Sequence, residues 1–215
     1  MNQMTKILGL LSILFVGGEL RAKTFELDKD HTNVGFSIRH ILTHVQGHFK
    51  DFAGGFETDD KGNLVKIDAM VKAASIDTSN KHRDEHLRSE DFFNAKKFSE
   101  LKFVSDKVKI KPGSTAKVSG QLTIHGVTKP VDFEVEYLGE AAGPGGHLKA
   151  GATGKLRINR KDYGLTWNTT LETGGVLVGD DVDIALDVEG NLKDSPKLAE
   201  VPAGTAKKVI KKEKK

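Results

Sequence analysis

The residues best suited to chemistry form one short polar run, His82-Arg83-Asp84-Glu85-His86. Its spacing is that of the H-x-x-E-H motif of inverted zinc peptidases, in which two histidines bind zinc and the glutamate acts as the base. A catalytic zinc also needs a third protein ligand, usually from a supporting helix. A zinc-dependent hydrolase using His82, Glu85 and His86 is therefore kept as the alternative. The favoured interpretation is a polar helix with His82, Asp84 and Glu85 toward water.

A second histidine series, His40, His44 and His48, also has helical ligand spacing. The residues between these histidines are β-branched or include glycine, which disfavours a helix. In a strand, side chains four residues apart stand about 13 Å apart, too far for one metal ion. A solvated loop is therefore predicted here.

Other reactive chemistry finds no support in the sequence. It contains no cysteine, which excludes disulfides, thiolate nucleophiles, iron–sulfur clusters and cysteine-bound zinc. No nucleophile elbow, P-loop or dinucleotide-binding motif occurs either. No cofactor, metal or catalytic residue is predicted.

Phenylalanine is concentrated in one part of the chain. Seven of the eleven phenylalanines lie between positions 49 and 103. They are Phe49, Phe52, Phe56, Phe92, Phe93, Phe98 and Phe103. Large apolar side chains at this density can line a cavity or fill an ordinary core, and their spacing leaves both alternatives open.

The elements that must position these residues are mostly strands. Apolar and polar residues alternate with a period of two in many segments, and turn residues separate the segments. The alternating segments are 34–38, 65–71, 118–124, 131–137, 148–158 and 182–192, and further strands are expected from Phe49 to Phe56 and from Leu101 to Ile110. Only Asn80 to Asn94 suits a helix. The pattern predicts an all-β fold, a closed antiparallel barrel of about eight strands with a short helical insertion, with a sandwich as the alternative.

The two ends of the chain differ from the body. Residues 7–16 form an uncharged, mostly apolar run of signal-peptide length, so residues 1–22 are predicted to be a signal peptide that exports a bacterial protein to the periplasm or the medium. Residues 193–215 are predicted to be a disordered basic tail that could at most contact a membrane surface weakly. Residues 23–192 then form one domain.

The net charge gives no sign of a nucleic-acid partner. The formal charge of +3 includes +5 from residues 207–215 and +1 from residues 1–22, which leaves −3 for residues 23–206. A mildly acidic body lacks the basic surface that nucleic-acid binding requires.

Several blocks of sequence, in order across the body, carry a resemblance to a known family. They include 25–28, 31–40, 47–52, 74–78, RDEHLRSEDFF at 83–93, LTIHGVTKPV at 122–131, and 178–184. In these blocks the chain resembles the YceI-like family of secreted, lipocalin-like proteins. Two features depart from the family pattern: Phe98-Ser99, where an aromatic-proline step is usual, and the basic tail.

The resemblance implies an elongated eight-stranded barrel whose interior tunnel binds a long apolar chain, usually in a homodimer and without catalysis. The implied ligand is an isoprenoid, an isoprenoid quinone or a fatty-acyl amide. Residues expected to touch the chain are Phe36, Ile38, Phe49, Phe52, Phe56, Phe92 and Phe93. Residues expected nearer the mouth, or bracing the helical insertion, are His31, His40, Arg83, His86, Arg88 and Asp91.

Overall fold

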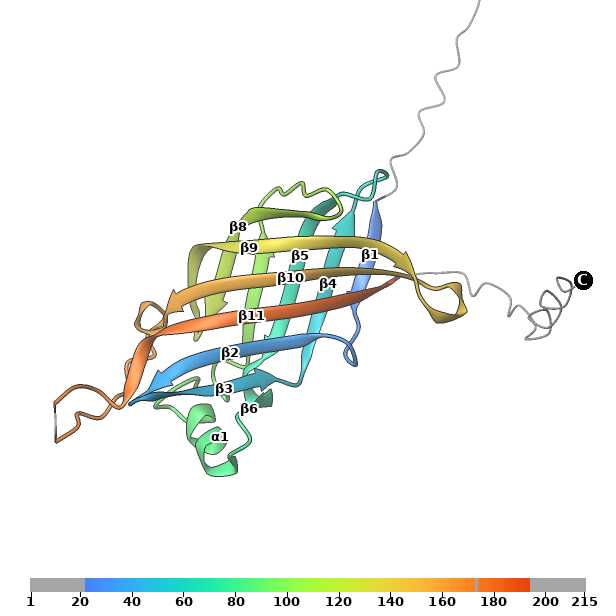
Figure 1. The fold of residues 1–215 in the computed structure, drawn as a ribbon. Coiled ribbons are helices and arrows are strands. Elements are labelled where there is room, and N and C mark those ends of the chain that lie inside the picture. Colours follow the sequence, from blue (N-terminus) through green and yellow to red (C-terminus); the bar gives the residue numbers. More distant parts are fainter. Residues whose placement is uncertain (1–21, 173, 194–215) are drawn as a thin grey trace, which may run out of the picture.

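One antiparallel sheet that closes on itself dominates the computed structural model (Figure 1). The structure describes residues 22–172 and 174–193. Of the predicted signal peptide (1–22) and the predicted tail (193–215), all but Ala22 and Lys193 therefore lie outside the described residues. Within the described residues, no helix has the length and apolar character needed to cross a membrane.

Eight strands form the closed ring, in the order β1-β4-β5-β7-β8-β9-β10-β11 and back to β1. Their bounds are β1 Lys23–Leu27, β4 Phe52–Thr58, β5 Leu64–Lys72, β7 Glu100–Ser105, β8 Ser114–Ile124, β9 Val127–Ala142, β10 Leu148–Asn159 and β11 Val178–Leu192. In strands whose apolar and polar residues alternate, one face is buried and the other faces solvent. Closure of the ring leaves no exposed strand edge in it. The predicted eight-stranded antiparallel barrel is confirmed, and the sandwich is not.

A second set of strands branches from the ring along β11. These are β2 Asn33–His40, β3 Thr43–Phe49 and the short β6 Ile76–Asp77. Near its end β11 pairs with β1, with Phe25 opposite Leu192, whereas over its first half it pairs with β2, with Ile38 opposite Val182. Since β1 and β2 share one edge of β11, the barrel is narrow at the β1 end. At the other end the β2–β3–β6 branch replaces β1 beside β11, and the wall splays open.

The narrow end is filled with side chains. Phe25 and Phe56 stack there with ring centroids 5.3 Å apart, and Phe25, Leu64 and Tyr137 are at most 1% exposed. Gly55 permits this packing, because a β-carbon at its position would lie 1.8 Å from the Phe25 carbonyl oxygen. This plug blocks the barrel at one end only.

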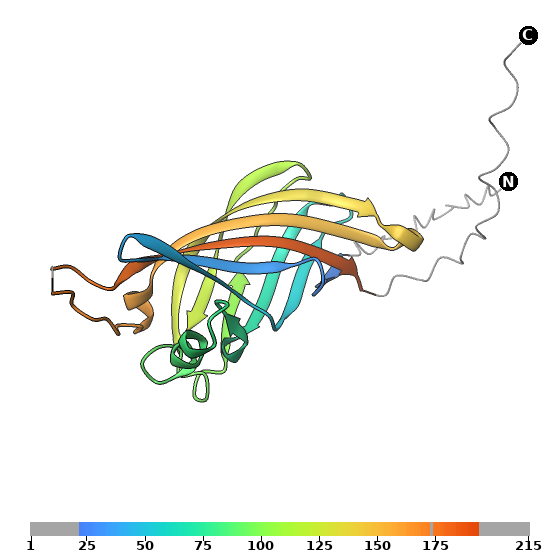
Figure 2. The same ribbon diagram turned by 60° about the horizontal axis from the view of Figure 1, so that its bottom comes forward.

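The helical insertion covers the open end. Helix α1 spans Lys81–Arg88, and short 3-10 helices span Ala73–Ser75, Pro144–Gly146 and Arg160–Tyr163. Both views place α1, together with the segments 168–172 and 174–177 (below, the arm), at the end of the molecule opposite to the point where β11 ends (Figures 1 and 2). The Asn80 side chain caps α1 by accepting from the Arg83 amide at 3.1 Å.

Three sequence-based expectations about this region were wrong. Phe49 to Phe56 is not one strand, because Phe49 and Phe52 are both buried and an odd spacing cannot put both on one face of a strand. A turn at residues 50–51 separates β3 from β4. The segment with His44 and His48 is strand β3 rather than a solvated loop, since its β-branched residues pair with β2. The strand predicted to end at Ile110 ends at Ser105, and Ile110 only bridges to Leu64.

Candidate functional site

The open half of the barrel contains two adjoining cavities lined almost wholly by apolar side chains. The inner chamber, of about 170 Å³, lies inside the ring, and the outer chamber, of about 300 Å³, lies between β2, β11 and the helical insertion. They share five lining residues: Phe36, Phe49, Leu101, Ile124 and Ile184. The two chambers therefore adjoin, and together they extend from the open end toward the plug; we call them the tunnel.

Alternating residues of the strands line the inner chamber. In β11, Ile184, Leu186 and Val188 point inward, while the residues that alternate with them, such as Asp183 and Asp187, face water. Besides Phe36 and Phe49, which both chambers share, the aromatic part of the wall comes from Phe56, Phe103 and Phe133, the last two packed edge-on with centroids 4.9 Å apart. The period-two pattern thus makes the cavity wall as well as the strand.

Aromatic residues from three separate segments enclose the outer chamber. Phe92 follows α1, Trp167 lies at the base of the arm, and the His86 ring lies 5.0 Å from Phe92 and 4.9 Å from Trp167, edge-on to both. Phe93 packs against Phe49 at 5.9 Å. These contacts place α1 and the arm over one apolar space.

The helix is held in place by buried polar contacts. Asp84 is 6% exposed, and its carboxylate accepts from the Thr78 amide at 2.9 Å and from the Thr78 hydroxyl at 2.6 Å. The expectation that Asp84 faces water was therefore wrong. A satisfied buried carboxylate fixes the start of α1 against the strand before it. Arg88 donates to the carbonyl oxygens of Ala74 and Ile76 at 2.7 and 2.8 Å.

The predicted site residues fall into two groups. Those that line a chamber are Phe36, Ile38, Phe49, Phe56, Phe92, Phe93, His40, Arg83 and His86. Four others do not line either chamber: Phe52, which is buried in the wall, His31, Arg88 and Asp91. Arg88 braces the insertion, and Asp91 bonds the His86 ring at 2.9 Å. Lipid contact at any of these residues remains a prediction.

Sequence reasoning missed the arm and the residues just before it. Leu165, Trp167 and Leu177 line the outer chamber, yet they lie in irregular backbone without periodicity. The positions of Leu165 and Trp167 depend on Arg160, which is 3% exposed and donates to their carbonyl oxygens at 2.5 and 2.9 Å. Its only sequence signal is an arginine at the end of a strand.

The zinc alternative gains no support from the geometry. Its His82 is exposed on α1, and His86 is engaged by Asp91. Within the described ranges, no third His, Asp or Glu completes a ligand cluster with them. His40, His44 and His48 form no such cluster there either.

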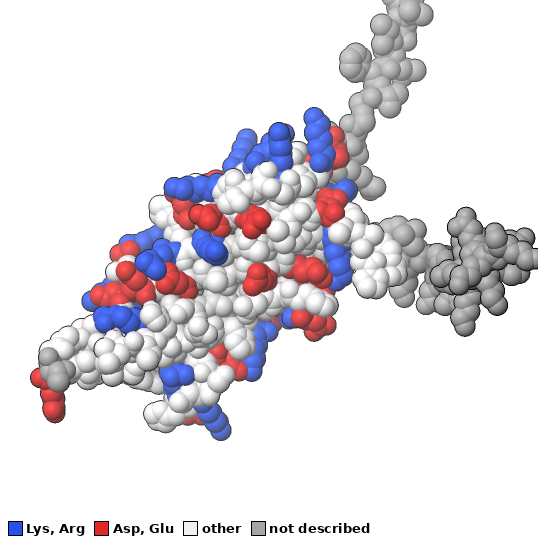
Figure 3. Space-filling model, viewed as in Figure 1, with Lys and Arg blue, Asp and Glu red and all other residues white. Residues whose placement is uncertain are grey.

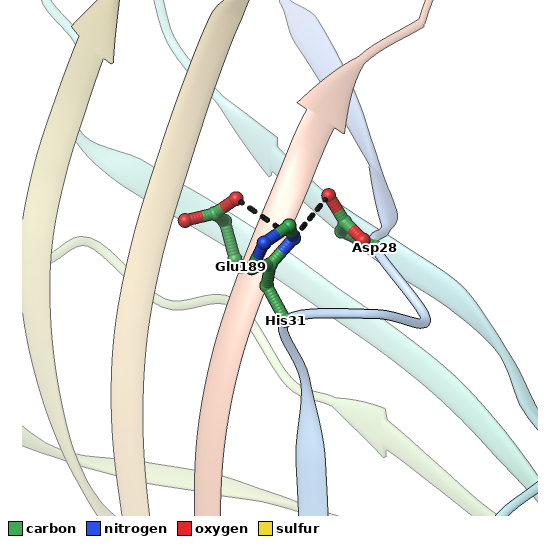
Figure 4. A group of neighbouring side chains, drawn as sticks. All are labelled: Asp28, His31 and Glu189. Atoms are coloured by element: carbon green, nitrogen blue, oxygen red, sulfur yellow. Dashed lines mark hydrogen bonds and ion pairs between the residues drawn. The ribbon is translucent and has the colours of Figure 1, made fainter. Parts of the chain in front are cut away.

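The described residues hold one cluster with metal-ligand composition, Asp28, His31 and Glu189 (Figure 4). The Lys149 ammonium group lies where a cation would bind in this cluster, because its Nζ is 2.9 Å from Asp28 Oδ2 and 2.5 Å from Glu189 Oε1. The Lys149 hydrogen bond is the largest cause that lowers the Asp28 pKa far below its usual range, while Asp28 and Glu189 raise the pKa of Lys149. This network ties the β1–β2 turn to β10 and β11, and it is structural.

Replacing Asp28 by asparagine should flatten the acid limb of the stability profile. A carboxyl whose pKa is lowered by folding contributes stability above its unfolded value of about 3.9, and this stability is lost as the pH falls through the folded value. The measurement is urea unfolding from pH 6 to pH 2. We expect Asp28→Asn to cost about 1–3 kcal/mol at pH 6 and progressively less below pH 4. An equal cost at pH 6 and pH 2 would contradict the assignment.

Comparisons with known proteins agree with this architecture. Residues 25–190 match the family model described as the YceI-like domain. The chain belongs to the YceI-like family. A UPF0312 protein of Enterobacter sp. (strain 638) is 37% identical over 193 residues, which cover 86% of this chain and 96% of that protein. Protein YceI of Salmonella arizonae is 36% identical and covers 84% of this chain and 93% of its own.

Solved structures of other proteins share the fold. The crystal structure of a Campylobacter jejuni YCEI protein matches with a TM-score of 0.63 at 36% identity, covering 78% of this chain and 97% of that one. A polyisoprenoid binding domain from Saccharophagus degradans matches with a TM-score of 0.60 at 14% identity, covering 81% and 100%. The second likeness concerns the fold alone.

Proposed function

We propose that this YceI-like barrel holds one long apolar chain, an isoprenoid or fatty-acyl lipid, for transport or storage and makes or breaks no bond. The two adjoining apolar chambers carry this proposal. Burial of a hydrocarbon chain against aromatic and aliphatic side chains is favourable, because it removes apolar surface from water. The Saccharophagus degradans domain of the same fold is described as polyisoprenoid binding, which supports the ligand class.

The lining suggests how the ligand lies in the tunnel. The inner chamber ends at the Phe25–Phe56 plug, so the apolar tail would occupy it. The ionisable side chains that line the outer chamber are His40, His82, Arg83, His86 and Arg160. All of them can donate hydrogen bonds, and no carboxylate among the described residues lines the chamber. We therefore place the polar end of the ligand there, and we favour a head group with acceptor oxygens.

Binding affinity should rise steeply with tail length. Each five-carbon isoprene unit buried contributes about 4 kcal/mol gross, and ordering costs remove part of it, so at least about tenfold per unit is expected until the tunnel is full. The measurement is displacement of a fluorescent fatty-acid probe by prenyl alcohols of two to eight units. Affinity that is independent of length would contradict the tunnel, whereas a head-group series at fixed length should change affinity less.

Two further measurements separate the other candidate functions. Elemental analysis showing about one zinc per chain, with hydrolysis lost in His86→Ala, would favour a zinc enzyme. A clean organic extract and no uptake of added lipid would favour a domain that only mediates structure or protein contacts.

We also propose that the protein acts after export, in the periplasm or outside the cell, as a homodimer. The apolar run at residues 7–16 and the absence of cysteine support export. The resemblance to YceI-like proteins supports the dimer. Cell fractionation and light scattering of the purified protein test these two points.

A further inference from the structure

Exposed aliphatic side chains gather at the open end of the tunnel. Leu42, in the turn between β2 and β3, is 93% exposed, Ile41 beside it is 40% exposed, and Val176 in the arm is 39% exposed. The Ile41 amide donates to the Leu177 carbonyl oxygen at 3.0 Å, which joins the turn to the arm. We call Ile41, Leu42 and Val176 the mouth tip.

The mouth tip adjoins the lining of the outer chamber. His40 and Val45, on the two strands that the turn connects, line that chamber, and so do Leu177 and Val178 next to Val176. Each residue of the tip is therefore within a few positions of a lining residue.

The turn that carries Leu42 is held in an unusual backbone conformation. Ile41 has a φ of +52°, in the left-handed region that β-branched residues strongly disfavour. The Leu177 carbonyl oxygen accepts from the Ile41 amide, and Arg39 Nη1 donates to the Ile41 carbonyl oxygen at 3.3 Å. Glycine or asparagine would fit this backbone without strain. Isoleucine at this position, followed by a leucine in solvent, indicates that the turn serves to present apolar side chains.

We propose that the mouth tip inserts into the surface of a lipid bilayer, so that the ligand passes between bilayer and tunnel without crossing water. This inference rests on the proposed function, because a long-chain lipid is stored in membranes. Three aliphatic side chains expose on the order of 300 Å² of apolar surface. That is well below the roughly 800 Å² per partner of a stable protein interface, so a bilayer fits this patch better than a second copy of the chain.

The charge distribution favours contact driven by apolar burial. Figure 3 shows few charged side chains over the end of the molecule that carries the arm, whereas both signs are dense over the barrel wall. Shallow apolar insertion depends little on salt, unlike attraction of a basic tail to anionic lipid. The described chain leaves the barrel after β11, at the opposite end, so the tail and the mouth tip predict different orientations on a membrane (Figure 1).

The test uses the full chain and phosphatidylcholine vesicles that carry a fluorescent long-chain prenyl lipid. We expect Leu42→Asp to lower the rate of lipid transfer from vesicles to protein by about tenfold or more, because the tip loses a large apolar side chain and gains a charge. The matched control is Leu138→Asp, since Leu138 is 57% exposed on the outside of β9 and far from the mouth in sequence and fold. It should transfer lipid at the wild-type rate.

Lipid delivered from cyclodextrin separates this inference from the proposed function. The two variants and the wild type should bind cyclodextrin-delivered lipid with equal affinity. If the wild type binds no lipid delivered from cyclodextrin, the proposed function fails. Insertion of the mouth tip is then still tested by whether the protein sediments with vesicles that carry no prenyl lipid. Wild-type transfer or sedimentation by Leu42→Asp would overturn the inference. The inference would also be overturned if the wild type is a dimer and Leu42→Asp is not. It would be overturned too if transfer to the wild type disappears when the salt concentration rises from 0.05 to 0.5 M.

Discussion

Replacing Phe36 by aspartate is expected to abolish lipid uptake. Phe36 lines both chambers, so its side chain stands where the inner and outer parts of the tunnel meet. Its ring packs 5.8 Å from that of Phe49 and directly over Gly47, where a β-carbon would lie 2.5 Å from the ring. A carboxylate at this point would have to lose its water when a hydrocarbon enters, at a cost of several kcal/mol, or roughly a thousandfold in affinity. Titration of the wild type and the variant with a fluorescent prenyl lipid measures this loss of affinity.

Two control variants make this result specific. Phe36→Leu keeps an apolar wall and should bind within about tenfold of the wild type. Arg88→Ala should weaken binding only modestly, because Arg88 contacts backbone oxygens behind α1 and not the chambers. Circular dichroism verifies that each variant is folded. A greater loss in Arg88→Ala than in Phe36→Asp would count against the tunnel.

The second large effect is expected from Arg160→Met. The buried guanidinium donates from Nε to the Gly179 carbonyl oxygen at 2.8 Å and from Nη1 to those of Leu165 and Trp167. Its burial lowers the pKa of Arg160, and Asp180 at 3.4 Å partly opposes this shift. Removing the guanidinium leaves several carbonyl oxygens without donors, so we expect a loss of about 3 kcal/mol in the free energy of unfolding.

Arg160→Met should also loosen one wall of the outer chamber. Since Leu165 and Trp167 lose their anchor, affinity for long-chain lipid should fall with stability, and Trp167 fluorescence should shift toward longer wavelength. The matched control is Arg157→Met, three residues earlier in β10, because Arg157 forms an exposed pair with Asp183 at 2.6 Å. That pair is worth at most about 1 kcal/mol. Urea unfolding that shows equal losses for the two variants would contradict the role given to Arg160.

The strands with clear alternation were predictable, and so was much of the inner chamber. In β11, Ile184, Leu186 and Val188 face inward because every second residue is apolar, and the same residues line the cavity. Strand β1 was not predicted. It has five residues and a single fully buried side chain, Phe25, so the alternation of apolar and polar residues is too short to recognise. Consequently β2 was expected within the ring, whereas it lies in the branch that opens the barrel.

The outer chamber depended on contacts between segments far apart in the sequence. Trp167 reaches the chamber through Arg160, and Arg160 is fixed by Gly179, which is 19 positions away. Such contacts leave no local pattern. The phenylalanine cluster at 49–103 did point to this region, but the odd spacing of Phe49 and Phe52 marks a turn between two strands and was interpreted as one strand. The resemblance to YceI-like proteins supplied the tunnel that the spacing alone left open.

Native mass spectrometry without detergent tests the central claim most directly. The full chain is incubated with an eight-unit prenyl lipid, desalted and sprayed beside the Phe36→Asp variant. The account predicts a mass increase of one lipid per chain for the wild type and the bare chain mass for the variant. A wild-type spectrum that shows only the bare chain, or equal lipid adducts on both proteins, would contradict a tunnel that holds a hydrocarbon chain.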